Sequence, residues 1–286
     1  MPKNKVVATV DKYAVKDYQS IDLLKELHIL TRDGKMNQDS RRKIKQVLHL
    51  VQFIEPIIQS VTAQKGTFQL IDFGSGKSYL GFMLYDLVAK LLSTPFNIIG
   101  IDVRSELVDY CQNLAQKLNF EHMSFYHLSA EESLFAPELP KNIDIVTALH
   151  ACNTATDDAI KFALEKNVEH LILVPCCQAE LASMFNKNKS ESLKNSYFTA
   201  LWKYPIHTRE FGSHITNVLR CLYLESKGYD VTVTELVGWE HSLKNELIIA
   251  NKMPHPGKMA KAQNQLKSLL EEFNLKTLAP RYEIFI

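Results

Sequence analysis

The sequence predicts an α/β fold in which a mostly parallel, seven-stranded sheet ends in an antiparallel edge pair. Short runs rich in β-branched residues alternate with helical patterns from residue 68 onward, which is typical of βαβ units. A glycine-rich turn links the first of these runs to the helical pattern after it, as in doubly wound parallel sheets. Near the end of the sequence, two strand patterns follow each other without a helical pattern between them, which predicts an antiparallel pair.

The individual elements follow from local periodicity. Apolar residues recur at spacings of three and four between residues 21 and 61, as on one face of a helix, and Pro56 marks a kink or weak point there. Further helices are expected at residues 78–92, 105–118, 154–166 and 212–227. The seven strands are expected at residues 68–73, 97–102, 123–128, 143–149, 169–175, 229–237 and 246–250.

These patterns divide the chain into three parts. Residues 1–65 are expected as a helical N-terminal extension packed on the core, and residues 66–252 as the domain that holds the sheet. Residues 253–286 are expected as a helical C-terminal tail. The polar stretch 178–212, which contains several aromatic residues, is expected as a lid or an insertion in the central domain.

Composition and patterning argue against several classes of protein. The chain has 286 residues, 46% of them hydrophobic, and its apolar runs stay well short of the ~18 residues of a membrane span. The segment Met1–Tyr13 is polar and charged, unlike a signal peptide, so we expect a cytoplasmic location. Five cysteines, an odd number with two of them adjacent, favour reduced thiols over a disulfide framework.

The net charge of +1 is unevenly distributed along the chain. Residues 1–65 carry twelve basic and seven acidic side chains, residues 66–250 carry fifteen and twenty-two, and residues 251–286 carry six and three. This distribution fits a core whose basic ends bind nucleic acid, and it also fits scattered solvated lysines. The basic residues that truly cluster are Arg41, Arg42, Lys43 and Lys45.

The glycine-rich turn predicts a ligand site. Asp72 ends the first strand, and Gly74 and Gly76 permit positive φ angles and a close approach of a ligand to the backbone. A phosphate-binding P-loop requires glycine at the position of Ile71, and a dinucleotide site requires a third glycine at Tyr79. The remaining interpretation is an adenosyl ligand without a phosphate, with Asp72 organising the loop and accepting a bond from the ammonium group of a methionyl moiety.

Two further strand ends extend this site. Asp102 ends the second strand, where a carboxylate accepts bonds from both ribose hydroxyls and repels a 2′-phosphate; the alternative is a helix N-cap. The third strand ends near Ser129 and Glu131, where a contact with adenine is expected; the alternative is that Ser129 caps a short helix. The predicted cofactor-binding residues are Asp72, Gly74, Ser75, Gly76, Asp102, Val103, Ser129, Ala130, Glu131, Leu149 and His150.

Three blocks of residues together resemble those of a methyltransferase-domain family, namely Asp72–Leu80, Leu149–Asp158 and Pro175–Cys177. That family is related to the tRNA acceptor-stem 2′-O-methyltransferases, and the resemblance covers about residues 40–252. It implies a Rossmann-like class I methyltransferase fold, S-adenosylmethionine as the cofactor, and a catalytic role for the central domain. It also makes RNA, either tRNA or rRNA, the leading substrate hypothesis.

The candidate catalytic residues lie after the fourth and fifth strands, because ligands of doubly wound sheets lie at the carboxyl ends of the strands. His150 is the candidate general base for a hydroxyl nucleophile. Asp157 either orients His150 or caps the helix that begins near Thr154.

The cysteines at these strand ends permit a second chemistry. Cys152, Cys176 and Cys177 occupy the places where RNA methyltransferases acting at pyrimidine C5 carry a nucleophilic cysteine, and the alternative is that they are small packing residues. Zinc binding by these cysteines and His150 matches no known ligand spacing, so we expect no metal.

The segment from Tyr197 to Ser213 mixes aromatic and basic side chains. It suits base stacking and phosphate contact, and equally a packed lid over the active site. Two other functions remain open: a methyltransferase acting on small molecules or proteins, which the acidic central zone favours, and an inactive cofactor-binding scaffold. The residues of the segment that prompt the RNA hypothesis are Tyr197, Phe198, Trp202, Lys203, Tyr204, His207, Arg209 and Phe211.

Overall fold

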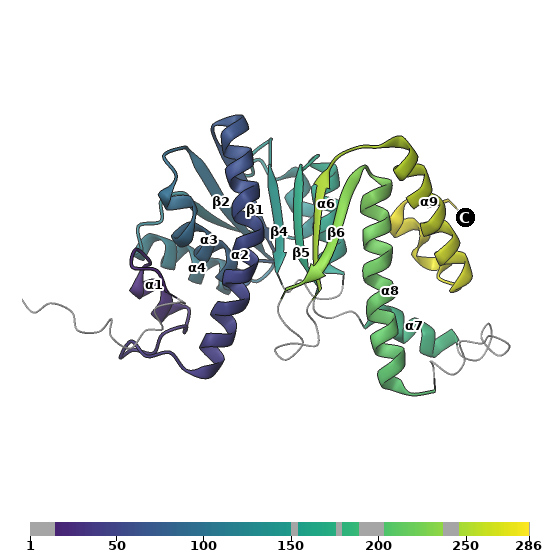
Figure 1. Cartoon of the computed structure of the whole chain (residues 1–286), viewed down its shortest axis with the longest axis horizontal. Coiled ribbons are helices and arrows are strands. Elements are labelled where there is room, and N and C mark those ends of the chain that lie inside the picture. Colours follow the sequence, from purple (N-terminus) through teal and green to yellow (C-terminus); the bar gives the residue numbers. More distant parts are fainter. Residues whose placement is uncertain (1–14, 150–153, 176–178, 189–202, 237–245, 286) are drawn as a thin grey trace, which may run out of the picture.

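The protein is built on one seven-stranded sheet, seen in the centre of Figure 1. The structure is a computed structural model, and it describes residues 15–149, 154–175, 179–188, 203–236 and 246–285. Strand order across the sheet is β3-β2-β1-β4-β5-β7-β6. The strands are β1 (Phe68–Phe73), β2 (Phe96–Asp102), β3 (Met123–His127), β4 (Ile145–Leu149), β5 (His170–Val174), β6 (Tyr229–Glu235) and β7 (Glu246–Lys252).

Strand directions confirm the predicted fold class. β1 pairs in parallel with β2 and β4, and the parallel pairing continues to β3 on one side and β5 on the other. β7 is antiparallel to both of its neighbours, β5 and β6. The carboxyl ends of β1 to β5 therefore lie at one edge of the sheet, which we call the carboxyl edge.

The first face of the sheet is covered by α1 (Ile21–Glu26), α2 (Gln38–Lys65), α3 (Tyr79–Leu87) and α4 (Ser105–Lys117). In α2, the buried side chains of Leu50, Ile54 and Ile58 recur every four residues and pack into this layer of the core. Pro56, the predicted weak point, lies inside α2 on its exposed side, and the helix spans it. Asn37 caps the start of α2 by accepting a hydrogen bond from the amide of Ser40.

The second face carries α5 (Ala130–Phe135), α6 (Ala155–Glu165), α8 (Pro205–Ser226), α9 (Pro256–Glu272) and the 3-10 helix η4 (Lys276–Tyr282). A further helix, α7 (Glu180–Asn188), packs on α8. The stretch expected as an insertion therefore contains α7 and the first two turns of α8, which begins at Pro205 rather than at residue 212. The buried face of α8 starts with Thr208, Gly212 and Thr216. Because these residues are small or polar, they show no apolar periodicity from which a helix could be predicted.

Gly212 sets how closely α7 and α8 approach each other. A Cβ atom built on Gly212 lies 2.8 Å from the backbone nitrogen of Ala182 on α7. We expect Gly212→Ala to lower the free energy of unfolding by about 1–3 kcal/mol, as overpacked cores do, despite the better helix propensity of alanine. Urea unfolding of the variant and the parent measures this difference in the free energy of unfolding.

Gly257 on α9 is the matched control, because a Cβ atom there meets its nearest neighbour, His255, at an ordinary 3.5 Å. Gly257→Ala is expected to leave the protein equally or more stable. Equal effects of the two substitutions would contradict the close packing of α7 on α8.

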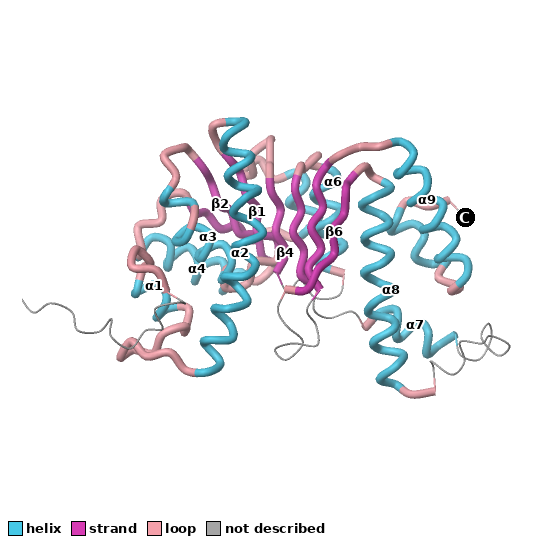
Figure 2. Tube along the Cα trace, viewed as in Figure 1, coloured by secondary structure: helices cyan, strands magenta, loops and turns pink. Residues whose placement is uncertain are grey.

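Two long helices extend beyond the carboxyl edge of the sheet. The N-terminal half of α2, with α1 beside it, projects past that edge on one side, and the N-terminal half of α8, with α7, projects past it on the other (Figures 1 and 2). Within the described ranges, the structure contains no helix that is both long and apolar enough to cross a membrane.

Candidate functional site

A pocket of about 470 Å³ opens at the carboxyl edge, between the glycine-rich turn and α2. Such strand ends are where doubly wound sheets bind their ligands. The turn contributes Gly74 to Lys77 to its lining, α2 contributes Gln46 and Val47, and β4 contributes Leu149. The described residues of its lining are Gln46, Val47, Asp72, Gly74, Ser75, Gly76, Lys77, Tyr79, Leu80, Arg104, Leu107 and Leu149.

The glycine-rich turn alternates left-handed and ordinary backbone. Gly74 and Gly76 have φ angles of 66° and 58°, as their residue type permits, and Ser78 has a φ of 47°. The turn is held by a hydrogen bond from the Ser75 amide to the Ile101 carbonyl, 2.9 Å long. A second bond, 2.7 Å long, joins the Ser78 amide to the Ser75 carbonyl. The strained backbone of Ser78 was not predicted from the sequence.

Asp72 holds the turn in place through hydrogen bonds to its carboxylate. One carboxylate oxygen accepts a hydrogen bond from the Thr147 hydroxyl at 2.8 Å, and the other accepts one from the Ser78 hydroxyl at 3.2 Å. Burial raises the pKa of Asp72 to about 6, because it disfavours the charged form more than the two hydroxyls stabilise it. The left-handed conformation of Ser78 thus accompanies a buried hydrogen bond to Asp72.

Asp102 closes the other side of the turn. Its carboxylate accepts a hydrogen bond from the Gly76 amide at 2.8 Å and two from the Arg104 guanidinium at 2.9 and 3.0 Å. Burial alone would raise the pKa of Asp102, but these donors outweigh it and hold the pKa below its ordinary value. The N-cap position of α4 is occupied by Arg104, so the alternative role of Asp102 as that cap is wrong.

Arg104 is a site residue that the sequence analysis missed. Its side chain is 54% exposed, yet its guanidinium forms a two-point pair with Asp102 and lies in the wall of the pocket. The two oxygens that we assigned to ribose hydroxyls therefore already have donors. Gln46 was missed as well, because sequence alone does not show which turn of α2 lies over the glycine-rich turn.

The third strand end has a local structural role. Ser129 and Glu132 form a capping box at the start of α5, in which the side chain of each accepts a hydrogen bond from the backbone amide of the other. Val103 is 62% exposed, and Glu131 is exposed as well. Among the described residues of the pocket lining, Ser129, Ala130 and Glu131 do not appear. The helix-cap alternative for Ser129 is confirmed.

Of the predicted catalytic residues, the structure describes Asp157. Asp157 lies in the first turn of α6, and both of its oxygens accept hydrogen bonds from Arg220 at 3.0 and 2.7 Å. Leu149 lines the pocket. His150, Cys152, Cys176 and Cys177 lie outside the described residues. Within the described ranges, no cluster of three or more histidine, cysteine or acidic residues is arranged to hold a metal ion.

The described part of the aromatic and basic segment divides into two roles. Phe211 packs against Phe185 and Phe273, at ring-centroid distances of 5.9 and 5.6 Å, and the three rings form one cluster, which favours packing over base stacking for this residue. Tyr204 is 50% exposed, and both Lys203 and His207 contact its ring. Tyr197, Phe198 and Trp202 lie outside the described residues.

Comparisons with known proteins agree with this architecture. Residues 42–184, half of the chain, match the model of a family described as a methyltransferase domain. A curated relative from Drosophila pseudoobscura pseudoobscura, a glutathione S-transferase C-terminal domain-containing protein homolog, is 26% identical over 209 residues, covering 65% of this chain. The match covers 33% of that relative, so the chain spans about a third of the length of the curated protein it matches.

Solved structures with a similar arrangement include two methyltransferases. Magnesium protoporphyrin IX methyltransferase from Synechocystis PCC 6803, solved with bound S-adenosylhomocysteine, is 15% identical with a TM-score of 0.43, covering 85% of this chain and all of that one. An rRNA methylase from Streptococcus thermophilus is 10% identical with a TM-score of 0.41, covering 71% of this chain and 94% of that one.

Proposed function

This chain belongs to the methyltransferase-domain family, and we propose that it transfers a methyl group from S-adenosylmethionine bound in the pocket at the carboxyl edge. The family match and the seven-stranded sheet support that cofactor. The observation that carries the proposal is the pair of carboxylates, Asp72 and Asp102, at the ends of neighbouring parallel strands on either side of one glycine-rich turn.

The pocket has the chemistry that this cofactor needs. A Cβ atom built on Gly74 meets no atom of the described residues within 4 Å, so the backbone there is open to a ligand. Asp72 provides negative charge for a methionyl ammonium, and Asp102 provides acceptors for ribose hydroxyls. When bound, S-adenosylmethionine supplies an activated methyl group on its sulfonium.

The protein's part in the reaction is to bind, align and exclude water, because the donor is already activated. Gln46 and Leu149 border the pocket from two sides and are placed to limit the position of the ligand. We retain His150 as the proposed base for a hydroxyl acceptor, and Cys152, Cys176 and Cys177 as the proposed nucleophiles for a ring-carbon acceptor.

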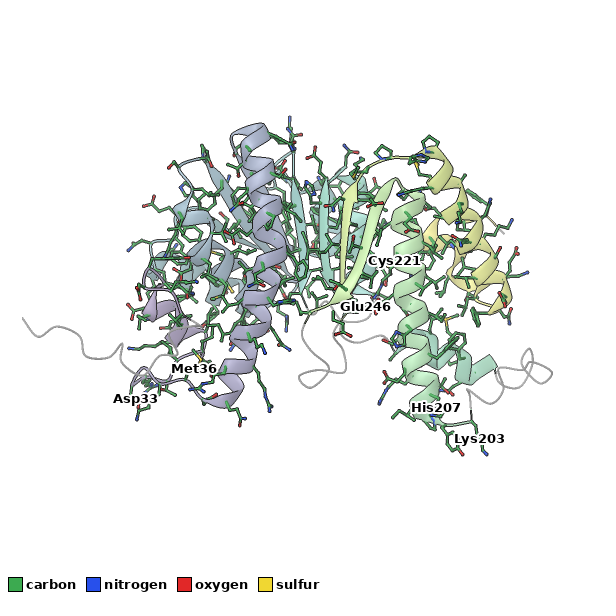
Figure 3. All side chains as sticks on the ribbon, in the orientation of Figure 1. Asp33, Met36, Lys203, His207, Cys221 and Glu246 are labelled. Atoms are coloured by element: carbon green, nitrogen blue, oxygen red, sulfur yellow. The ribbon has the colours of Figure 1, made fainter. Side chains whose placement is uncertain are left out.

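For the acceptor we propose RNA. Two basic groups support this choice. The first turns of α2 expose Arg41, Arg42 and Lys45. On the other side, His207 in the first turn of α8 and Lys203 just before that helix are exposed; both are labelled in Figure 3. The two groups lie on opposite sides of the carboxyl edge, where a polyanion spanning the site would contact both (Figure 1). The excess of acidic over basic side chains in residues 66–250 instead favours the alternative acceptor, a small molecule or a protein.

Calorimetric titration tests the cofactor. The purified protein is titrated with S-adenosylhomocysteine, ATP and NAD, and we expect only the first to bind. Absence of binding by all three would count against the proposed function. Retention of tRNA transcripts at increasing salt tests the acceptor, because phosphate contacts weaken steeply with salt concentration. Retention that does not depend on salt would contradict an RNA acceptor.

Cofactor affinity is expected to depend on pH through Asp72. Its raised pKa of about 6 in the free protein means that the carboxylate must lose a proton to pair with a ligand ammonium. Affinity for S-adenosylhomocysteine should therefore rise with pH up to about 6 and then level off, with about tenfold weaker binding at pH 5 than at pH 7. Calorimetry across pH 5–8 measures this.

The control for this prediction is Asp72→Asn, which keeps the side-chain shape but carries no titrating group. Its affinity is expected to be low and nearly constant over the same pH range. A pH dependence that survives in the variant would show that another group is responsible.

A further inference from the structure

Among the residues that the structure describes, Arg220 on α8 is the largest of the fully buried side chains, with 1% of its surface exposed. A buried guanidinium is retained only where its charge and its donors are matched. It pairs with Asp157 at two points, from Nε to Oδ1 at 3.0 Å and from Nη2 to Oδ2 at 2.7 Å. This pair fixes the first turn of α6, the helix that follows residues 150–153 in the chain.

A second connection from Arg220 reaches the start of β7. Its Nη1 donates a hydrogen bond to the Asn217 side-chain oxygen at 3.2 Å, and the Asn217 amide donates one to Glu246 at 2.7 Å. Asn217 is 2% exposed. Glu246 is the first residue of β7 and follows residues 237–245; Figure 3 shows it at the end of the strand nearest the carboxyl edge.

A third connection begins on the other side of Asp157. Arg281 on η4 lies 4.0 Å from the same carboxylate and forms a two-point pair with Glu180 at 2.7 and 2.9 Å. Glu180 is the first residue of α7, which begins just after residues 176–178. Arg220, Asp157 and their partners thus join the starts of α6, α7 and β7.

We infer that Arg220 is a positioning residue for methyl transfer. It ties together the three elements that begin at the carboxyl edge directly after residues 150–153, 176–178 and 237–245. None of the residues in this network lies in the described lining of the pocket. The effect expected of the network is therefore on the methyl-transfer side of the ligand, with the binding of the adenosyl part left close to that of the parent. The inference rests on the proposed function for the identity of the ligand.

The test uses Arg220→Lys in the full chain, which keeps the charge but loses the two-point geometry. Arg209→Lys is the matched control, because Arg209 is exposed on the same helix and pairs with its neighbour Glu210. Two ligands are titrated: S-adenosylhomocysteine, which lacks the methyl group, and sinefungin, which carries an amine in place of the methyl-bearing sulfonium. Hydrogen–deuterium exchange of the ligand-free proteins is followed peptide by peptide.

We expect Arg220→Lys to bind S-adenosylhomocysteine within about twofold of the parent, while the ratio of the two affinities changes at least fivefold. Exchange should be about tenfold faster at the starts of α6 and β7 and unchanged in residues 74–80. Loss of packing alone would move both ligands together. An unchanged ratio, or exchange that rises uniformly along the chain, would overturn the inference.

Glu246→Ala provides a second variant, in case Arg220→Lys does not fold. It breaks only the connection to β7 and leaves no buried charge, so faster exchange should be confined to the start of that strand. Exchange there equal to that of the parent would also overturn the inference. Failure of the parent to bind either ligand would instead count against the proposed function, and the exchange data would still decide whether the connections hold.

Discussion

Asp157→Ala is expected to lower the free energy of unfolding by about 3–5 kcal/mol, because it leaves the Arg220 guanidinium buried without its counter-ion. Both partners are almost fully buried, with side-chain exposures of 1% and 10%. Water therefore cannot replace the lost carboxylate. Urea unfolding monitored by circular dichroism provides the measurement.

The control for this prediction is Asp230→Ala. Asp230 pairs with Lys258 on the surface, where both side chains are more than half exposed, so its loss should cost less than about 1 kcal/mol. The double substitution Asp157→Leu with Arg220→Met should regain much of the lost stability, since no unpaired charge remains. Equal costs for Asp157→Ala and Asp230→Ala would contradict the buried pair.

Asp102→Ala is expected to weaken the binding of S-adenosylhomocysteine by about 1.5–3 kcal/mol, which corresponds to roughly 10- to 150-fold. The substitution removes the proposed ribose acceptors and also the partner of the Gly76 amide, which shapes the turn. Calorimetry measures the affinity, and thermal unfolding checks that the variant remains folded.

Arg104→Ala separates the two roles of that carboxylate. It removes the guanidinium from Asp102 but leaves the carboxylate and its bond to Gly76. We expect the affinity of Arg104→Ala for S-adenosylhomocysteine to be at least that of the parent, because the ribose hydroxyls no longer compete with a cation for the same oxygens. Near-parental affinity in Asp102→Ala would remove Asp102 from the cofactor site.

Much of the fold could be predicted because its signals are local. The bounds of β1, Phe68–Phe73, match the prediction, since a buried strand there is followed at once by a glycine-rich turn. The sheet's antiparallel end also followed from two adjacent strand patterns. α7 and the start of α8 lie in the polar stretch that was expected as a lid or an insertion, and the start of α8 packs through a glycine and threonines, which show no apolar period. α5 was expected only as the short helix in the capping alternative for Ser129, because six residues are too few to show a period.

The candidate site was predictable only in part, for a similar reason. Asp72 and the two glycines stand together in the sequence, so their pattern was visible. Thr147 binds Asp72 from a position 75 residues away, and Arg220 binds Asp157 from 63 residues away. Such pairings depend on how strands and helices meet in space, which one sequence does not specify residue by residue.

The place of β7 in the sheet has a consequence for how the chain folds during synthesis. β7 lies between β5 and β6, although it follows both in the chain. Until residues 246–252 have left the ribosome, β5 has an open edge, and its residues Leu171–Val174 are all apolar and all buried in the finished protein. Nascent chains that already contain β5 but not β7 therefore expose an aggregation-prone strand, and they are the species that should most need a chaperone.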